Sequence, residues 1–539
     1  MKIYGNIIDI INKKIFKGFI RIENSRIAEL GKEDAGESRY IMPGLIDSHI
    51  HIESSMLVPS RFAEAAVRHG TVSVVADPHE IANVMGIEGV EFMIENSKTV
   101  ALKFYFGAPS CVPATEFESS GGRIGPRDIT KLLEREDIKF LSEMMNFPGV
   151  INEDKEVINK IRAARDLGKP VDGHAPGLRG KELEKYIGSG ISTDHESLTL
   201  EEAKEKIRRG MKIQIREGSA ARSLDRFHSL LKEDLSMIML CSDDLHPEML
   251  ERGHIDILVR RLLALGYDIF SILQVAVVNP VLHYKLDTGL LRKGDRADFI
   301  VIDNPRDFNV SETWINGERV YDGNRINFRS PPVKPVNRFN CTQINPRDIA
   351  VGKRKGSIRV IDAVDGDLVT GIYEWSPENT GEYVCPDTGK DILKLIVKDR
   401  YNDSAPAVAF IRGFGIKSGA FASSIAHDSH NIIAVGCDDE SICRAVNRVV
   451  EMKGGLAACN DLEDRQIKLE TAGIMSDVPC GTLAKEYEEI SEAVKTAGCK
   501  LESPFMTLSF MALLVIPELK LGDRGLFDVN RFRFTELFV

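Results

Sequence analysis

The sequence predicts an α/β protein: a (β/α)₈ barrel of the TIM type, joined to a small composite β-sandwich domain and a C-terminal α+β domain. Three observations lead to this prediction. Eight short apolar runs alternate with amphipathic helical stretches, short strand patterns lie on both sides of them, and a proline-rich segment precedes a region of mixed pattern. A chain of 539 residues is also too long for one ordinary core, so several domains are expected.

The β-sandwich prediction joins the two flanks of the barrel. Residues 1–42 contain short alternating strand patterns separated by turns, as in KGFIRIENSRIAEL. Residues 285–330 return to short strand patterns after the barrel, as in ADFIVIDNP. We therefore expect 1–42 with 285–330 to form one composite domain.

The barrel prediction covers residues 43–284. Its apolar runs are GLIDSHIH, TVSVVADP, ALKFYFGAP, IKFLSEMM, KPVDGHAP, ISTDHES, MKIQIREGS and LSMIMLCSDD. Helical stretches between them, such as TLEEAKEKIRRG, end in the glycine that often follows a helix. Eight strand–helix units in about 240 residues match the usual size of such a barrel. A doubly wound open sheet is the alternative, and the missing nucleotide fingerprint favours a closed barrel.

The C-terminal prediction covers residues 340–539. The proline-rich linker RSPPVKPV, residues 329–336, separates this region from the rest. Strand patterns such as NIIAVG are mixed with helical patterns such as TLAKEYEEISEAVKTAG, which is typical of an α+β domain.

Composition limits the class of protein. The formal net charge of −11 argues against a nucleic-acid-binding surface, and no apolar stretch is long enough to span a bilayer. The N-terminal residues MKIYGNIIDIINKK lack the order of a signal peptide. Nine scattered cysteines without C-x-x-C pairs fit reduced thiols, so we expect a cytoplasmic protein with neither a nucleic-acid nor a membrane partner.

Metal-ligating residue types recur where the predicted strands end, which is where barrels of this kind place the active site. His49 and His51 lie two apart at the end of the first run and so share a face of the strand. A lone strand histidine is more often structural, but several histidines and carboxylates at one rim predict a centre of two divalent ions. The expected ligands are His49, His51, Glu143, His174, His195 and Asp243. Imidazole and carboxylate donors suit Mn²⁺, Fe²⁺ or Zn²⁺.

Several motifs resemble known families. PGLIDSHIH, the histidines ending the fifth and sixth runs, and SDD ending the eighth resemble the amidohydrolase superfamily. The runs HIHIESSM, ADPHEIANVMG, GHAPGL, IREGSAA and IAHDSHN resemble the prokaryotic adenine deaminases over essentially the whole chain. This resemblance implies that the protein converts adenine to hypoxanthine and ammonia by means of a metal-bound hydroxide at a binuclear centre. The implied role of this reaction is purine salvage. The resemblance also implies iron or manganese, with zinc often found instead.

The fourth strand departs from the commonest superfamily pattern. Many members bridge two metals with a carboxylated lysine there, whereas IKFLSEMM offers Glu143. Lys139 lies near the start of the strand, about 13 Å away at the usual strand rise. A glutamate can bridge two cations without added CO₂, and the adenine deaminases resemble this chain in that respect.

Further residues have expected roles in the reaction. Asp243 should take the proton of the attacking water and return it to the leaving ammonia. A protonated carboxylic acid should supply a proton to the purine N1, and both Glu196 and Glu217 are placed for this. We expect Arg216 and His79 to contact substrate, although Arg216 could instead pair with a neighbouring glutamate and His79 could orient a ligand. Residues expected to orient metal ligands are Asp77 and Asp244.

A C-terminal segment is a second source of site residues. SSIAHDSHNIIAVG, residues 423–436, places His427, Asp428 and His430 between two apolar stretches. We expect this loop to cover the barrel mouth and exclude water, with His427 or His430 reaching substrate or an additional ion. A local hydrogen-bonded turn is the alternative.

Competing functions stay open at this point. One is a cyclic amidohydrolase of the dihydroorotase or hydantoinase type, which commonly uses the bridging lysine missing here. Another is a non-catalytic scaffold, although such a chain should have lost ligands and none is missing. A further alternative is incidental redox chemistry at two irons, as a side activity and not as the main function. We further expect a homodimer or a higher homo-oligomer.

Overall fold

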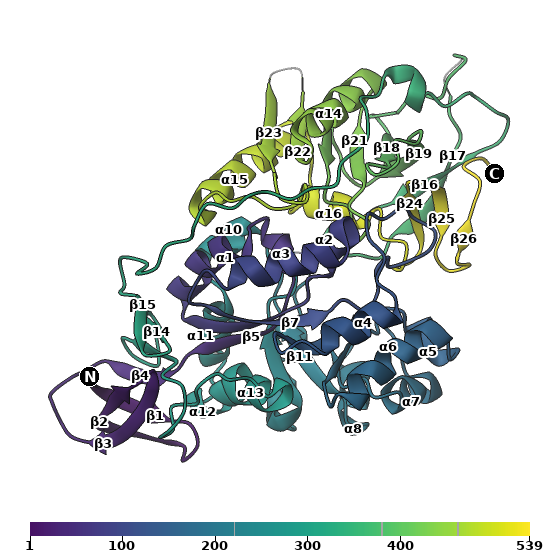
Figure 1. Ribbon diagram of the computed structural model, residues 1–539. Coiled ribbons are helices and arrows are strands. Elements are labelled where there is room, and N and C mark those ends of the chain that lie inside the picture. The colour runs from purple at the N-terminus through teal and green to yellow at the C-terminus, as the bar shows by residue number, and fades with distance from the viewer. Residues whose placement is uncertain (220, 379–380, 461–462) are drawn as a thin grey trace.

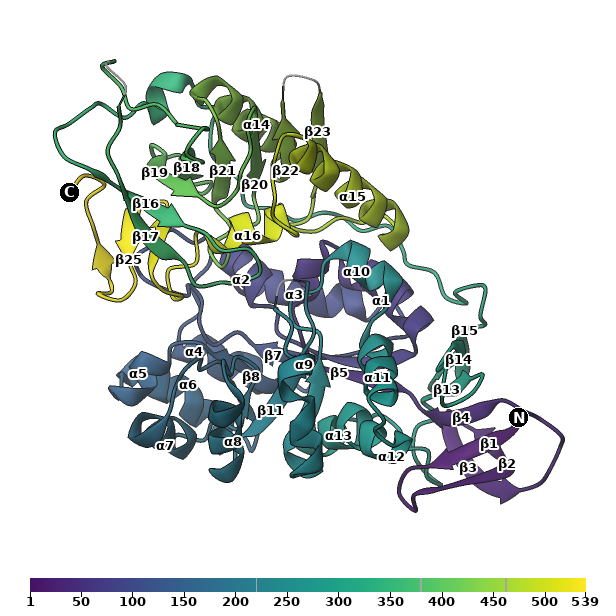
Figure 2. The same ribbon diagram turned by 180° about the vertical axis from the view of Figure 1, so that it is seen from behind.

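The protein consists of three parts, which Figure 1 and Figure 2 show from opposite sides. The computed structural model describes residues 1–219, 221–378, 381–460 and 463–539. The N-terminus lies in a sheet at one end, the barrel lies in the middle, and the C-terminal domain packs along the opposite side of the barrel (Figure 1). Within the described residues, no helix combines the length and the apolarity that crossing a membrane requires.

The two flanks of the barrel form a composite β element, as predicted from their strand patterns. Its strands are β1 (Lys2–Asp9), β2 (Lys14–Glu23), β3 (Arg26–Lys32), β4 (Tyr40–Pro43), β13 (Phe299–Ile302), β14 (Val310–Ile315) and β15 (Glu318–Tyr321). Strand β4 joins the flanks because it pairs parallel to β1 and antiparallel to β13. The strands of this element are hydrogen-bonded in the order β15-β14-β13-β4-β1-β2-β3, and residues from both flanks share one buried apolar cluster.

The eight predicted barrel strands all form, in the predicted order. They are β5 (Leu45–Ile50), β6 (Thr71–Ala76), β7 (Lys103–Ala108), β8 (Ile138–Met144), β9 (Val171–Gly173), β10 (Thr193–Asp194), β11 (Lys212–Arg216) and β12 (Ile238–Cys241). Strands β5 to β9 and β10 to β12 form two parallel sheets. At one seam the N–H of Asp243 donates to the carbonyl of His49 at 3.0 Å, and at the other the N–H of Ser192 donates to Val171 at 2.9 Å. These contacts close the barrel.

Helices follow the strands and cover the barrel. They are α1 (Pro59–Ala66), α2 (His79–Met85), α3 (Ile87–Ser97), α4 (Pro126–Leu133), α5 (Phe147–Ile151), α6 (Lys155–Asp166), α7 (Gly180–Gly188), α8 (Leu200–Arg208), α9 (Leu224–Phe227), α10 (Pro247–Arg252), α11 (Ile255–Ala264), α12 (Ile269–Leu273) and α13 (Asn279–Tyr284). Most strand residues are buried because both faces of a barrel strand are covered, which explains the uninterrupted apolar runs.

The C-terminal domain is built on a mixed eight-stranded sheet of order β17-β16-β19-β18-β21-β20-β22-β23. These strands are β16 (Ile358–Asp362), β17 (Gly371–Trp375), β18 (Leu393–Lys398), β19 (Ala407–Arg412), β20 (Ala420–Ser423), β21 (Ile432–Gly436), β22 (Gly455–Cys459) and β23 (Asp464–Lys468). The other elements are α14 (Asp439–Met452), α15 (Cys480–Thr496), α16 (Pro504–Phe510), β24 (Leu519–Gly522), β25 (Gly525–Asp528) and β26 (Arg533–Phe534).

The barrel and the C-terminal domain share one hydrophobic core. Helices α1, α2, α3 and α10 lie between the two in both views (Figures 1 and 2). Buried residues of the barrel, such as Leu57 and Val84, belong to the same apolar cluster as Leu483 and Leu513 of the C-terminal domain. The N–H of Ser476 also donates to the carbonyl of Met56 at 2.8 Å. The C-terminal domain is therefore fixed against the mouth side of the barrel.

Candidate functional site

The strand ends of the barrel bring the predicted metal ligands together. His49 is the last residue but one of β5, and His51 follows that strand directly. Their Nε2 atoms lie 3.2 Å apart, as expected for side chains on one face of a strand. Nε2 of His51 also lies 3.2 Å from Oδ1 of Asp243, which follows β12. All three side chains are buried.

Glu143, near the end of β8, lies between two sets of histidines. Its Oε1 is 3.4 Å from Nε2 of His51, whereas its Oε2 is 2.8 Å from Nδ1 of His174 and 3.2 Å from Nε2 of His195. Burial favours the neutral acid, but His174 and His195 hold the pKa of Glu143 well below its usual range. Glu143 is therefore a carboxylate whose two oxygens face different ligands.

The donor set fits divalent metal. Nearest atoms of His49, His195 and Asp243 lie within 4.8 Å of one another, and the same is true of Glu143, His174 and His195. The Nε2 atoms of His49 and His51 face each other, so the lone pairs of two neutral rings would repel. A cation bound by both nitrogens would remove this repulsion. Nitrogen and oxygen donors without thiolate suit Mn²⁺, Fe²⁺ or Zn²⁺.

Arg216, the last residue of β11, is held by two carboxylates. Its Nη1 lies 2.6 Å from Oε1 of Glu196, its Nη2 donates to Oε2 of Glu196 at 2.7 Å, and Nη1 also donates to Asp243. Burial opposes the charge of Arg216, but Glu196 and Asp243 raise its pKa. Arg216 thus pairs with a glutamate, the alternative to a substrate contact, while it still lines the cavity at the barrel mouth.

Glu217 is the predicted site residue that the strand turns away from the cavity. It follows Arg216 directly, and neighbouring residues of an extended chain point to opposite sides. Its carboxylate accepts a hydrogen bond from Arg261 of α11 and another, of 3.3 Å, from the N–H of Leu224. Of the two carboxylates left open by the sequence, only Glu196 lines the cavity.

His79 begins α2 and faces two groups of residues. Its Nδ1 lies 3.0 Å from Oδ2 of Asp77 and 3.6 Å from Oε1 of Glu143. Its Nε2 faces Asp428 of the C-terminal domain at 3.9 Å. Asp77 accepts the backbone N–H of His79, and Asp244 accepts the hydroxyl of Ser54 at 2.6 Å.

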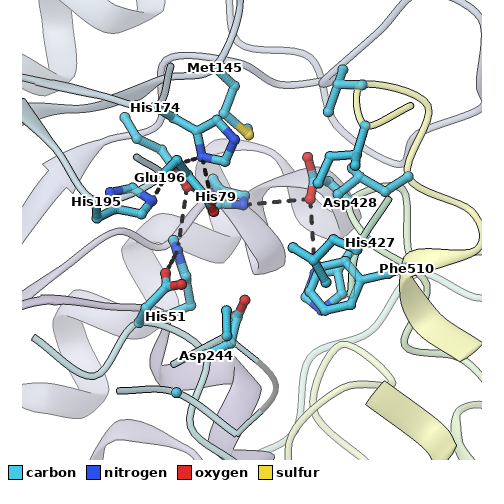
Figure 3. Close-up of a pocket in the computed structure, with 18 of the residues that line it drawn as sticks. His51, His79, Met145, His174, His195, Glu196, Asp244, His427, Asp428 and Phe510 are labelled. Carbon is cyan, nitrogen blue, oxygen red and sulfur yellow. Dashed lines mark hydrogen bonds and ion pairs between the residues drawn. The ribbon is translucent and has the colours of Figure 1, made fainter. Parts of the chain in front are cut away.

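The C-terminal domain forms one wall of the cavity. Figure 3 shows His427, Asp428 and Phe510 facing the barrel residues. The His427 ring stacks on Phe510, with ring centroids 4.6 Å apart and an interplanar angle of 13°. Apolar residues of the same domain complete this wall: Leu368, Leu513, Val515 and Ile516. His430 lies behind the wall and contacts Glu80 through Nε2.

Two buried acids were missed by the sequence prediction. Glu80, directly after His79, has its Oε1 2.7 Å from Nδ1 of His427. Asp47 accepts the N–H of His49 at 3.2 Å, and its Oδ2 lies 2.8 Å from Nε2 of His254. The signal available in the sequence was position alone, because each acid lies one or two residues from a predicted site histidine.

Two family models match the chain, one described as "Amidohydrolase family" over residues 40–320 and one as "Adenine deaminase C-terminal domain" over residues 367–533. A Methanosarcina acetivorans protein named adenine deaminase is 51% identical over 548 residues, covering 100% of this chain and 99% of that protein. A Salinibacter ruber protein of the same name is 49% identical over 539 residues, covering 100% and 99%. A solved β-aspartyl dipeptidase from Fervidobacterium islandicum is similar at TM-score 0.47 and 17% identity, covering 60% of this chain and 98% of that one.

Proposed function

The chain belongs to the adenine deaminase family of amidohydrolases, and from this premise we propose that it hydrolyses adenine to hypoxanthine and ammonia. The observation that carries the proposal is the convergence of buried histidines and carboxylates from the barrel strands, beneath a wall from the matched C-terminal domain. Such a site combines metal ligands with a cavity lined by polar and apolar side chains, as the site of a small-molecule hydrolase requires.

We infer that the centre holds two divalent ions, Mn²⁺ or Fe²⁺, with Zn²⁺ as a third candidate. The residues that would hold them are His49, His51, Glu143, His174, His195 and Asp243. Bound there, divalent cations lower the pKa of a coordinated water and so supply a nucleophile at neutral pH. Glu143 is suited to serve both ions because its oxygens face different histidines.

Asp243 is the proposed proton carrier between water and leaving group. Burial raises the pKa of this carboxyl, but Arg216, His49 and His51 hold it well below its usual range. An ionised carboxylate facing the attacking water accepts its proton and passes it to the departing ammonia.

Glu196 is the proposed proton donor to the purine N1. Arg216 pairs with both of its oxygens, which stabilises the carboxylate in the resting site. Glu196 would accept the first proton of the attacking water and pass it to N1, whereas Asp243 passes the second proton of that water to the departing ammonia. Glu217 cannot take this part from its position beside Arg261.

The remaining cavity residues are proposed to bind and enclose the purine. His79, His427 and Arg216 offer polar atoms at the cavity wall, and Phe510 offers an aromatic face. The apolar residues of the C-terminal wall exclude water from the reacting atoms. His430 acts through Glu80, because its Nε2 contacts that carboxylate and not the cavity.

We also propose that the enzyme serves purine salvage in the cytoplasm and works as a homodimer or a higher homo-oligomer. Hypoxanthine is a purine base that can be recycled, and the scattered cysteines suit a reducing compartment. Sedimentation analysis of the purified chain would measure its oligomeric state.

The test is an activity screen across adenine, dihydroorotate and hydantoin with protein loaded with Mn²⁺, Fe²⁺ or Zn²⁺. We expect adenine turnover and none of the cyclic amides, since Glu143 occupies the place of the bridging lysine that cyclic amidohydrolases commonly use. Turnover of a cyclic amide without turnover of adenine would overturn the proposal.

A further inference from the structure

A second group of metal-ligating side chains lies beside the barrel centre, where α2 meets the C-terminal loop of residues 427–430. Glu80 of α2 stands at its middle. Nδ1 of His427 lies 2.7 Å from Oε1 of Glu80, and Nε2 of His430 contacts Oε2 of the same carboxylate. Two domains therefore supply imidazoles to the two oxygens of one buried acid.

Two more side chains complete this group. Nε2 of His79 lies 3.5 Å from Oε1 of Glu80 and 3.9 Å from Oδ1 of Asp428. The same oxygen of Asp428 lies 3.9 Å from Nδ1 of His427. The group is buried, with residue exposures of 2% for Glu80, 4% for Asp428 and 1% for His430. Every donor is nitrogen or oxygen.

Charge is the reason to expect a cation here. Glu80 and Asp428 bring two carboxylates into a buried site, and in the described part of the chain neither pairs with a lysine or an arginine. Buried carboxylates need a compensating positive charge. Burial opposes a charge on His427, but Glu80 raises its pKa, so this ring supplies one positive charge. Burial lowers the pKa of His430, whose ring centroid lies only 5.8 Å from that of His427, so a second charge there is unfavourable. His79 also faces Asp77 and Glu143, so its ring does not balance Asp428 alone.

Hydrogen bonding leaves part of the group without partners. Among the residues that the structure describes, Oδ2 of Asp428 and Nδ1 of His430 are buried and find no hydrogen-bond partner. Buried polar atoms in a folded protein are normally satisfied, so these two atoms indicate a water or another ligand beside the group. They lie on the far sides of the atoms that face Glu80 and His79, namely Nε2 of His430 and Oδ1 of Asp428. A divalent cation would satisfy the charge of the two carboxylates together.

We propose that Glu80, His427 and His430 bind a divalent transition-metal ion, with His79 and Asp428 beside it, at a second position along the cavity that the barrel ligands also line. Imidazole with carboxylate suits ions such as Zn²⁺, Mn²⁺ and Fe²⁺. His79 separates the two sites, since its Nδ1 faces Asp77 and Glu143 whereas its Nε2 faces Glu80 and Asp428. The ion ties the C-terminal loop to α2 and so holds His427 and Phe510 in the cavity wall.

The test uses crystals of the full-length chain grown with Zn²⁺ as the sole added metal. We expect an anomalous peak between Glu80, His427 and His430, in addition to density in the barrel centre. Absence of that peak, with zinc present in the barrel, would overturn the proposal and leave the group as a set of ion pairs.

Variants separate the new site from the barrel. His430→Gln keeps a hydrogen-bond donor for Glu80 but replaces the imidazole, so zinc content should fall by about one ion per chain with the barrel peaks retained. The matched control is His246→Gln, another buried histidine, whose ring packs edge-on against Tyr487 of α15 with centroids 4.9 Å apart. The control should keep the wild-type zinc content.

The converse variant is Glu143→Ala, which should lose barrel zinc and keep the peak at Glu80. Unchanged zinc content in His430→Gln, with the melting temperature of the control, would contradict a metal site at Glu80. Loss of the Glu80 peak in Glu143→Ala would show that the two sites are one.

Discussion

Glu143 shows at the scale of one residue how the site works, because its two oxygens face different histidines. Replacing it with alanine removes both oxygens at once, so we predict that Glu143→Ala loses most of the barrel-bound metal. Metal analysis after reconstitution and gel filtration measures the content. Glu217→Ala is the matched control, since that buried carboxylate lies outside the cavity. Full retention of the barrel ions in Glu143→Ala would contradict the bridging role.

Asp243 and Asp244 are neighbours with different surroundings. Asp243 contacts His49, His51 and Arg216, whereas Asp244 accepts the hydroxyl of Ser54. The backbone of Asp243 has a φ of 61°, a left-handed conformation that asparagine also tolerates. We predict that Asp243→Asn folds normally but lowers kcat by about 10²- to 10⁴-fold. Asp244→Asn should cost much less in steady-state assays, and the reverse order would mean that the roles of the two are exchanged.

Glu196 and Glu217 can be distinguished in the same way. Glu196→Gln keeps the shape of the side chain but cannot carry a proton, so kcat should fall by about 10²-fold or more. Glu217→Gln weakens only the pair with Arg261, so we expect a lower melting temperature with kcat close to wild type. If Glu217→Gln lost more kcat than Glu196→Gln, Glu217 and not Glu196 would be the proton donor.

At the scale of elements, the local sequence pattern is sufficient to predict the strands of the barrel. It is insufficient to predict which side chains of different domains contact one another. The eight strands are predictable because apolar runs and turns are local signals, and even the two-residue strand β10 lies within the run ISTDHES. Alternation could also have shown that Arg216 and Glu217 face opposite sides. The partners of Glu80 were not predictable, since His427 is 347 residues away and periodicity carries no information over such separations. Nor does strand pattern give the order of the seven strands, since β4 pairs with β1 on one side and with the distant β13 on the other.

Strand β24 contains a buried lysine that makes the stability of the C-terminal domain depend on pH. Nζ of Lys520 donates to the carbonyls of Leu368 and Phe510 at 2.8 and 3.0 Å. Burial lowers the pKa of Lys520 to about 7, whereas the unfolded lysine has a pKa of about 10.4. Between these values the unfolded chain binds more protons, so the free energy of unfolding rises with pH across this window.

The variant that tests this is Lys520→Met, which has no group titrating in that range. As pH rises from about 7 to about 9, wild type should gain stability relative to the variant, by at most about 1.4 kcal/mol per pH unit. Melting temperatures of both proteins over that range provide the measurement. Parallel pH profiles would show that Lys520 stays protonated in the folded protein.

At the scale of the whole molecule, the barrel and the C-terminal domain depend on one another. Leu57 and Val84 of the barrel share an apolar cluster with Leu483 and Leu513 of the C-terminal domain. Removing one side would expose that surface to water, at a cost of about 25 cal/mol for each Å² of apolar area. The cavity is likewise incomplete in the barrel alone, because His427, Phe510 and their apolar neighbours form one wall.

We therefore predict two defects in a chain that ends after residue 330. It should melt less cooperatively than the full-length protein, and it should deaminate adenine more slowly. Because misfolding alone could abolish turnover in the truncated chain, a second variant keeps the core: the full-length His427→Ala, His430→Ala double variant. It should keep its melting temperature within a few degrees and retain the barrel ions. Its adenine turnover should fall by about 10²-fold, since it loses both a polar group of the cavity wall and the contact that holds the loop on Glu80. A truncated barrel that folds, binds the barrel ions and turns over adenine at the full-length rate would show that the C-terminal wall takes no part in the chemistry.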